Sequence, residues 1–489
     1  MEAASSNPHH ARRWAILAVL SIAQLMVVLD ATIVNIALPS AQADLGFSDG
    51  SRQWVITAYA LSFGSLLLLG GRISDMFGRK WTFIGGLIGF AVVSAIGGAA
   101  SSFGVLVAAR ALQGAFAALL APAALSLLTT TFTEPAERGK AFGVYGAIAG
   151  SGAAVGLLLG GVLTEYLDWR WCLYVNLLFA AVAVAGALAL FHSIRSGSHA
   201  KLDLPGTLTA SCGLFALVYG FANAEQASWT DPLTLAMFAA AAVLLTAFVL
   251  IERRAAQPLL PLRVVLDRDR GGSYLAVGLS GVAMFAVFLF LTYYLQQNLG
   301  MSPVTTGLAF LPMVAMIIVS STSANMKLLS RVGARPLVPT GMALGALGML
   351  YLTGLGAESS YAADILPALL VMGAGFGLIF APSIATATLG VDDDDAGVAS
   401  AMVNTSQQIG GSIGTALLST LAVSATESFV AASGAPPTAA LMEQAAVHGY
   451  TTAFYWSAAI FALGAVISAL LLRSHGRRVG KVAEPALAH

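Results

Sequence analysis

The run from Trp14 to Leu38 reads WAILAVLSIAQLMVVLDATIVNIAL, and its 25 residues include a single charged side chain, Asp30. A helix of about 20 apolar residues crosses the hydrocarbon core of a bilayer. The run therefore predicts a membrane-spanning helix with one carboxylate inside it. The rest of the chain agrees, because 57% of its 489 residues are hydrophobic and 10% are charged, whereas soluble domains carry about 25% charged residues.

Apolar runs of similar length recur along the chain and predict an all-α membrane protein with fourteen spanning helices. The runs are continuously apolar and do not alternate, which excludes membrane-spanning strands. The expected spans are 14–38, 54–71, 81–100, 105–130, 140–163, 171–191, 206–224, 233–251, 272–296, 305–326, 336–356, 361–388, 397–421 and 451–472.

The distribution of basic residues supports this count. If the N-terminus is cytoplasmic, the predicted inner segments hold 21 of the 24 Lys and Arg, and the outer loops hold only Arg52 and Arg170. The remaining basic residue, Arg110, falls inside a span. Because basic residues accumulate on the cytoplasmic side of membrane proteins, both termini are expected in the cytoplasm.

The expected helices divide into six, two and six. We expect a six-helix bundle over 1–195, a two-helix insert with a cytoplasmic linker over 196–270, a second six-helix bundle over 271–473 and a cytoplasmic tail over 474–489. A weak internal repeat supports a duplicated transporter. GRISDMFGRK follows the second span and NMKLLSRVGARP follows the tenth, and each places basic residues around a glycine between two helices.

Other classes of protein fit the sequence poorly. The His residues lie in tails and loops without metal-ligand spacing, and Cys172 and Cys212 fall near opposite membrane faces. We expect no metal, no cofactor, no disulfide and no nucleic-acid partner. A membrane enzyme would need clustered His, Cys or carboxylates, and the acidic run Asp392–Asp395 has no His or Cys nearby. A receptor would need larger extramembrane domains.

Several motifs resemble those of the major facilitator superfamily, and specifically its fourteen-helix drug:proton antiporter family. LDATIVNIALP (29–39) is similar to the first-helix signature, GRISDMFGRK (71–80) to the superfamily loop Gly-x-x-x-Asp-x-x-Gly-Arg-Lys, and RALQG (110–114) to the fourth-helix motif. DWRWCLYVN (168–176), YYLQQNLGMSPVTTGLAFLP (293–312) and AGVASAMVNTSQQIGGSIGTALL (396–418) resemble further signatures. The resemblance covers nearly the whole chain and implies proton-coupled drug efflux.

Two positions depart from this family's pattern. The fifth-helix motif reads GLLLGG (156–161), with Leu157 where the family carries proline, and the proline expected shortly after Asn176 is absent. Proline removes a backbone donor and bends a helix. We therefore expect a straighter fifth helix, which weakens the case for strict antiport.

Asp30 and Arg110 are the expected proton-coupling pair. At 1.5 Å per residue they lie about 14 Å and about 9 Å below the same membrane face. A charge at the bilayer centre costs about 2.5–3.5 kcal/mol, so it marks a functional site by default. Asp can lose its charge by taking a proton, whereas Arg stays charged. Gln113 follows Arg110 by three residues and is expected to orient it. The alternative is a permanent structural ion pair.

The loop GRISDMFGRK is the expected cytoplasmic gate, with Gly71, Asp75, Gly78, Arg79 and Lys80 as its residues. Asp75 can cap a neighbouring helix or pair with Arg79, and either contact favours one closed arrangement of the bundles. The alternative is that the basic residues serve membrane topology alone.

Glycines and polar residues inside the spans complete the expected site. Gly152, Gly156 and Gly160 recur every four residues beside Gly161, a stripe that lets another helix approach closely. We expect this stripe to pack between the bundles and seal them, with simple helix packing as the alternative. Candidates for a substrate cavity are Asn35, Tyr59, Tyr145, Asn176, Tyr293, Tyr294, Gln296, Gln297, Asn404, Gln407 and Gln408. For each of these, hydrogen bonding between helices is the alternative.

The sequence therefore predicts a monomeric, multi-pass transporter of the inner membrane that exports amphipathic drugs, toxins or secondary metabolites by alternating access. Protons supply the energy, and membrane lipids are its surroundings, with the Arg253–Arg270 loop as a candidate contact for anionic headgroups. The alternative function is small-metabolite uptake or uncoupled facilitation on the same fold, which Leu157 favours.

Overall fold

Every regular element in the described part of the computed structural model is helical. The described residues are 12–48, 51–132, 134–191, 203–255, 260, 262–324, 328–356, 358–388, 391, 396–434, 436 and 438–473.

Six long helices form a first group, α1–α6, whose members pack on one another. They are α1 (Arg13–Leu45), α2 (Trp54–Phe77), α3 (Arg79–Gly98), α4 (Phe103–Thr131), α5 (Pro135–Tyr166) and α6 (Trp171–Leu190). Phe83, Phe90 and Leu128 are among the buried side chains of the core that these helices share. α5 contains no proline beyond its first residue and runs unbroken through Leu157.

α1 extends beyond the expected span 14–38. It continues through Pro39 and ends at Gly46, which takes a left-handed conformation with φ +67°. Proline removes one helical hydrogen bond, which membrane helices tolerate where neighbouring groups satisfy the freed carbonyl. The helix ends where glycine permits the left-handed turn that closes many helices.

A pair of helices, α7 (Leu204–Gln226) and α8 (Pro232–Glu252), follows the first group. Each begins with an Asp that accepts backbone hydrogen bonds from its first turn, Asp203 in α7 and Asp231 in α8. α8 packs on α7, and α7 packs on both α2 and α15. The pair therefore lies against both halves of the molecule.

The second group, α10–α16, forms the other half. Its elements, with the short α9 before them, are α9 (Leu262–Val265), α10 (Arg268–Ala286), the π-helical turns η2 (Val287–Leu291) and η3 (Tyr294–Asn298), α11 (Pro303–Ser323), α12 (Leu329–Val332), α13 (Ala334–Leu352), η5 (Tyr361–Ile365), α14 (Leu366–Thr388), α15 (Ala396–Ser433) and α16 (Ala439–Leu471). The repeat predicted from the sequence has a structural counterpart, because Gly78 before α3 and Gly333 before α13 both take a positive φ.

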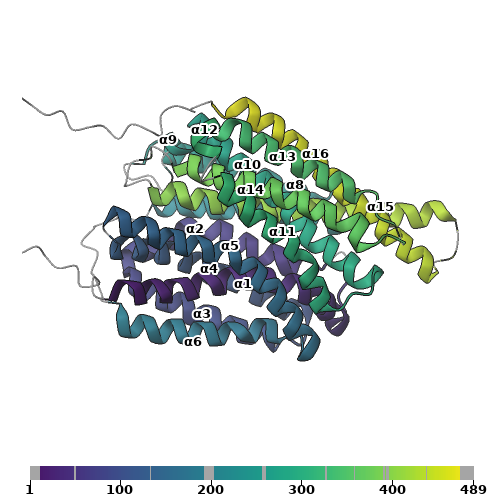
Figure 1. The fold of residues 1–489 in the computed structure, drawn as a ribbon, viewed down its shortest axis with the longest axis horizontal. Helices are drawn as coiled ribbons and strands as arrows, with labels where there is room; N and C mark the ends of the chain where they lie inside the picture. Colours follow the sequence, from purple (N-terminus) through teal and green to yellow (C-terminus); the bar gives the residue numbers. More distant parts are fainter. Residues whose placement is uncertain are drawn as a thin grey trace, which may run out of the picture.

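The segment between the expected spans 397–421 and 451–472 is mostly helical. α15 and α16 continue as helices through most of this segment and project beyond the other helices at the right of Figure 1. Gly449 packs against the backbone and side chain of α15 there, at Ala422 and Thr426. The close contact of two helices explains why this segment stays helical beyond its apolar stretch.

Eleven helices of the described chain are long and apolar enough to cross a membrane, judged by length and composition. They are α1, α3, α4, α6, α7, α8, α10 with its continuation to Asn298, α11, η5 with α14, α15 and α16. The apolar segments found in α2 and α5 are shorter, Trp54–Leu67 and Ala154–Tyr166, and α13 is not among the eleven.

Figure 1 shows the beginning of α1 and the end of α16 at the same end of the molecule, which we call the terminal end. The opposite end, where α5 ends and α6 begins around Trp169, is called the Trp169 end. The groups meet along two lines, α5 against α11 and α2 against α15. One apolar cluster continues across the contact and includes Ile33 and Leu157 of the first group and Phe310 of the second.

Candidate functional site

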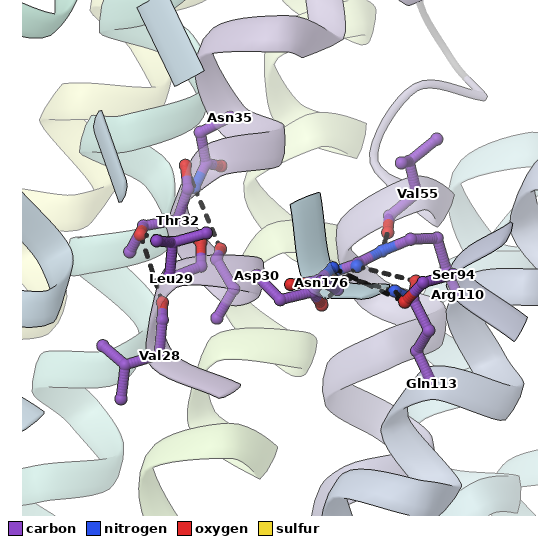
Figure 2. A network of polar contacts seen from close by, with 11 residues as sticks. Val28, Leu29, Asp30, Thr32, Asn35, Val55, Ser94, Arg110, Gln113 and Asn176 are labelled. Atoms are coloured by element: carbon purple, nitrogen blue, oxygen red, sulfur yellow. Dashed lines mark hydrogen bonds and ion pairs between the residues drawn. The ribbon is translucent and has the colours of Figure 1, made fainter. Parts of the chain in front are cut away.

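Asp30 lies at the centre of a buried polar network inside the first group (Figure 2). Its Oδ2 accepts from Arg110 Nη1 at 2.6 Å. Its Oδ1 accepts from Gln113 Nε2 at 3.0 Å and from Asn176 Nδ2 at 2.7 Å. Asp30 is fully buried and Arg110 is 2% exposed. The predicted Asp30–Arg110 contact is therefore present, and Gln113 joins both residues.

Arg110 also makes contacts that do not involve Asp30. Its Nε donates to the Val55 carbonyl at 3.1 Å, and its Nη1 lies 3.0 Å from Gln113 Oε1. Its guanidinium carbon lies 4.5 Å from the centre of the Tyr59 ring, within the range of a cation–π contact. The guanidinium thus has neutral partners on α2 and α4 in addition to the carboxylate.

Two members of the network had a weaker signal in the sequence. Asn176 of α6 was expected in a substrate cavity, yet it donates directly to Asp30. Ser94 of α3 was missed, and its Oγ accepts from Gln113 Nε2 at 2.7 Å and from Asn176 Nδ2 at 3.5 Å. A single serine in an apolar helix is common, so only the packing of α3 against α4 and α6 identifies Ser94 as part of the site.

Close packing of α2 and α4 brings Arg110 to its position. A side chain at Gly114 would place its Cβ 2.2 Å from the Tyr59 carbonyl, so only glycine allows this approach. Burial of the ion pair makes its integrity important. Removal of one partner from a buried pair costs about 3–5 kcal/mol, because the other charge stays uncompensated.

Of the expected gate residues, Lys80 makes a contact within the first group. Lys80 donates from Nζ to the Phe191 carbonyl at 2.5 Å, which ties α3 to the end of α6 within the first group. Gly78 has a φ of +89° and separates α2 from α3, with Gly71 in the preceding helix. The side chain of Asp75 lies outside the described residues, so its expected contact with Arg79 stays a prediction.

The glycine stripe faces α1, which corrects the prediction that it packs between the bundles. A Cβ at Gly152 would meet Val28, one at Gly156 would lie 2.0 Å from Thr32 Oγ1, and one at Gly160 would lie 2.8 Å from the Ile33 carbonyl. Spacing alone shows that a stripe exists, but it does not show which helix lies against it. Only Gly161, 2.7 Å from the Pro303 carbonyl by the same measure, faces the second group.

The remaining cavity candidates lie on several helices of both groups. Tyr145 donates to Gln24 at 2.6 Å, Tyr294 donates to the Gly356 carbonyl at 2.6 Å, and Gln297 and Asn404 are exposed. Asn35 donates to the carbonyls of Ala31 and Thr32 in its own helix. Gln407 lies 4.0 Å from Met284 Sδ of α10. In the described structure, the Oδ1 of Asn35, the hydroxyl of Tyr59 and the Oε1 of Gln408 are buried without a hydrogen-bond partner.

A small pocket lies one helical turn from the network, toward the Trp169 end. Its lining is apolar and includes Val34, Leu106, Trp169 and Leu173. Val34 follows Asp30 by four residues, which is about one turn of helix. The network is therefore separated from that end of the molecule by apolar side chains.

A family model described as Major Facilitator Superfamily matches residues 20–415 of this chain. The match covers most of its length. The chain belongs to the Major Facilitator Superfamily. Together with its eleven candidate spans, membership of the Major Facilitator Superfamily makes the chain a multi-pass membrane transporter and not an enzyme.

Two relatives within the Major Facilitator Superfamily are similar over most of their length. The puromycin resistance protein of Streptomyces alboniger is 51% identical over 476 residues, which is 97% of this chain and 94% of that protein. The cephamycin export protein of Amycolatopsis lactamdurans is 40% identical over 412 residues, which is 83% of this chain and 84% of that protein.

Solved structures share the Major Facilitator Superfamily fold at low sequence identity. A POT family transporter aligns with a TM-score of 0.68 at 15% identity, over 94% of this chain and 97% of that one. A bacterial homolog of the human lysosomal transporter Spinster, in an inward-facing and unoccupied conformation, aligns with a TM-score of 0.65 at 15% identity, over 96% of this chain and 98% of that one.

Proposed function

We propose that this protein exports amphipathic drugs, antibiotics or other secondary metabolites, and that protons flowing inward through Asp30 supply the energy. The single observation that carries the proposal is the ion pair of Asp30 and Arg110, fully enclosed among Gln113, Asn176 and Ser94. The puromycin resistance and cephamycin export proteins supply the substrate class. No cofactor takes part in the proposed cycle.

In this mechanism Asp30 holds the transported proton on its carboxylate. Protonation removes the negative charge, and Arg110 then relies on the Val55 carbonyl, the Gln113 amide oxygen and the Tyr59 ring. Because Arg110 keeps these neutral partners, the pair can separate without leaving the guanidinium bare. Asp30 is fully buried here, so proton exchange requires a movement that opens the network to water.

Thermodynamics limits what one such site can do. One charge crossing 100 mV releases about 2.3 kcal/mol. A single proton therefore supports a gradient of roughly fifty-fold in a neutral substrate per 100 mV, before any pH difference is added. Asp30 is the one carboxylate for which the sequence predicts this role, which favours one proton per cycle.

We further propose that α2, α5 and α13 also cross the membrane, which completes fourteen spans in the order six, two and six. The terminal end then faces the cytoplasm and the Trp169 end faces outward, as the distribution of basic residues favours. The parts are 1–195, 196–270 and 271–473 with a tail over 474–489, and the protein acts as a monomer among membrane lipids.

Uptake of a small metabolite or uncoupled facilitation remains the second candidate. The observation that favours it is Leu157, where α5 runs unbroken through the position at which the antiporter motif carries proline. Uncoupled transport would need no proton gradient, so the two candidates differ in one measurable respect.

The test uses inverted membrane vesicles that contain the wild type, Asp30→Asn or Asp44→Asn. Puromycin, lincomycin and a cephamycin are added in turn, and proton release from the vesicle lumen and drug uptake are recorded together. Coupled export predicts proton release in the wild type and in Asp44→Asn, a matched change near the end of the same helix, and its loss in Asp30→Asn. Drug movement that continues unchanged in Asp30→Asn without a gradient would establish facilitation instead.

A further inference from the structure

The motif YYLQQNLGMSPV, residues 293–304, has no part in the proton site, yet it makes the polar contacts between the two groups at the Trp169 end. It begins at Tyr293, between the two π-helical turns η2 and η3 that continue α10. Widened turns of this kind often occur at functional positions. The motif is therefore a candidate for a function separate from that of the proposed proton site.

Two side chains of the motif reach α1. The Tyr293 hydroxyl donates to Gln42 Oε1, and Gln296 Nε2 donates to the Ile36 carbonyl at 3.1 Å. Both partners belong to the first group. Because these polar groups pair across the contact between the groups, separation at this end breaks both hydrogen bonds.

Arg52 adds a charge to the same contact. It lies between α1 and α2, yet its side chain is only 5% exposed, because it enters the second group. Its guanidinium carbon lies 4.0 Å from the centre of the Tyr293 ring, 5.7 Å from that of Tyr450 and 6.0 Å from that of Phe290. These distances lie within the range of cation–π attraction, which is stronger for a desolvated cation.

The end of α5 meets the start of α11 beside these contacts. The carboxylate of Glu165 accepts from the Val304 backbone amide at 3.0 Å. A carboxylate at a helix N-terminus is favourable, because the free amides there carry partial positive charge. Glu165, Arg52 and Gln42 thus hold the second group from three different segments of the first.

We propose that Arg52, Gln42, Glu165, Tyr293 and Gln296 form a latch that holds the Trp169 end closed, with Arg52 in its aromatic cage as the main contact. Opening of the transporter at this end requires Arg52 to leave Tyr293, Tyr450 and Phe290. The latch rests only on separation of the two groups during transport. It requires neither proton coupling nor a particular substrate.

The chain contains a matched control at the same end. Arg170 pairs with Asp44 at 2.8 Å and with Asp168 at 3.5 Å, and it donates to the Ala100 carbonyl. All these contacts lie within the first group. Loss of Arg170 therefore removes an arginine from the same end of the molecule without touching the latch.

The experiment measures how often the end opens. Leu157 is fully buried, and its carbonyl would lie 2.6 Å from a Cβ at Gly307 on α11. Leu157→Cys in a Cys172→Ser, Cys212→Ser background is exposed in right-side-out vesicles to a membrane-impermeant methanethiosulfonate reagent. The labelling rate reports the open fraction even when that fraction is small. Ser101→Cys, exposed between α3 and α4, shows whether this end faces outward, so an error in the proposed topology is detected separately.

Arg52→Gln should raise the labelling rate of the Leu157→Cys reporter about tenfold, as expected for loss of a desolvated cation–π contact. Tyr293→Phe keeps the ring and should raise the rate only about threefold, through loss of the hydrogen bond to Gln42. Arg170→Gln should leave it unchanged. Wild-type rates in both Arg52→Gln and Tyr293→Phe, or an equal rise in Arg170→Gln, would overturn the latch. If Arg52→Gln does not fold, Tyr293→Phe and Gln296→Leu replace it, because each removes one hydrogen bond between the groups. The latch predicts a higher labelling rate in both variants, and wild-type rates in both would overturn it.

Discussion

At the scale of single residues, the main feature is a buried carboxylate whose hydrogen bonds come from two neighbouring helices. Asp30 of α1 receives Arg110 and Gln113 from α4 and Asn176 from α6. A buried ion pair contributes little net stability compared with apolar residues, but half of such a pair is strongly unfavourable. Loss of Arg110 alone is thus expected to destabilise the network, whereas loss of both charges is expected to be tolerated.

A double-mutant cycle tests this asymmetry. We expect Arg110→Gln to destabilise the protein by about 3–5 kcal/mol, because Asp30 stays buried without its counter-charge. Asp30→Asn combined with Arg110→Gln should recover most of this loss. Thermal unfolding in detergent provides the measurement. A double variant no more stable than Arg110→Gln alone would show that the charge of Asp30 is not the cause.

At the scale of elements, the packing of α1 against α5 depends on backbone proximity. Gly156 faces Thr32 and the Leu29 carbonyl, which lie within one turn of Asp30 on α1. The stripe therefore supports the helix that carries Asp30, the proposed proton site. It belongs to the interior of the first group, and the contact between the groups at α5 falls to Gly161 and Leu157.

Gly156→Ala should lower the unfolding free energy by about 1–3 kcal/mol, the usual cost of overpacking, since its Cβ would lie 2.0 Å from Thr32 Oγ1. Gly85→Ala is the matched control, because a Cβ there meets nothing within 4 Å. Alanine favours helix over glycine, so Gly85→Ala should be neutral or stabilising. Unfolding midpoints of the two variants give the answer, and equal midpoints would contradict the packing argument.

At the scale of the whole molecule, two groups of helices meet along α5–α11 and α2–α15, and α7 covers the second line. Ser211 of α7 donates to the Ser65 carbonyl of α2 at 2.8 Å, and α7 also packs on α15. The insert thus contacts both groups along the α2–α15 line. Val155 and Leu308, beside the α5–α11 line, are exposed. Movement of the two groups must accommodate α7.

Gly307→Ala should act on this movement and leave the Asp30 network intact. Its Cβ would lie 2.6 Å from the Leu157 carbonyl, so closure at α5–α11 becomes unfavourable by about 1–3 kcal/mol. Labelling of the Leu157→Cys reporter should therefore rise. A Cβ at Gly104 would meet no other atom within 4 Å, so Gly104→Ala should leave labelling at the wild-type rate. A Gly307→Ala variant that labels no faster would show that the contact yields without cost.

Hydrophobic length and the scarcity of intramembrane charge determined much of this protein from its sequence alone. Continuous apolar runs predict helices wherever a bilayer excludes water. Two opposite charges in such runs, Asp30 and Arg110, are expected to pair because an isolated charge inside the bilayer is unfavourable. Helix ends were harder, because Pro39 does not stop α1 and the α15–α16 segment stays helical beyond its apolar residues. These ends depend on contacts between distant segments.

Only the tertiary structure decided which faces meet. Spacing cannot tell whether a glycine stripe lies against α1 or against the other bundle, since both contacts need the same small residues. Ser94 and Asn176 join the Asp30 network because α3 packs on α4 and α6, which in turn pack on α1. Arg52 likewise enters an aromatic cage built from two distant helices. Such partners are set by the relative placement of whole helices, which the local pattern of residues does not encode.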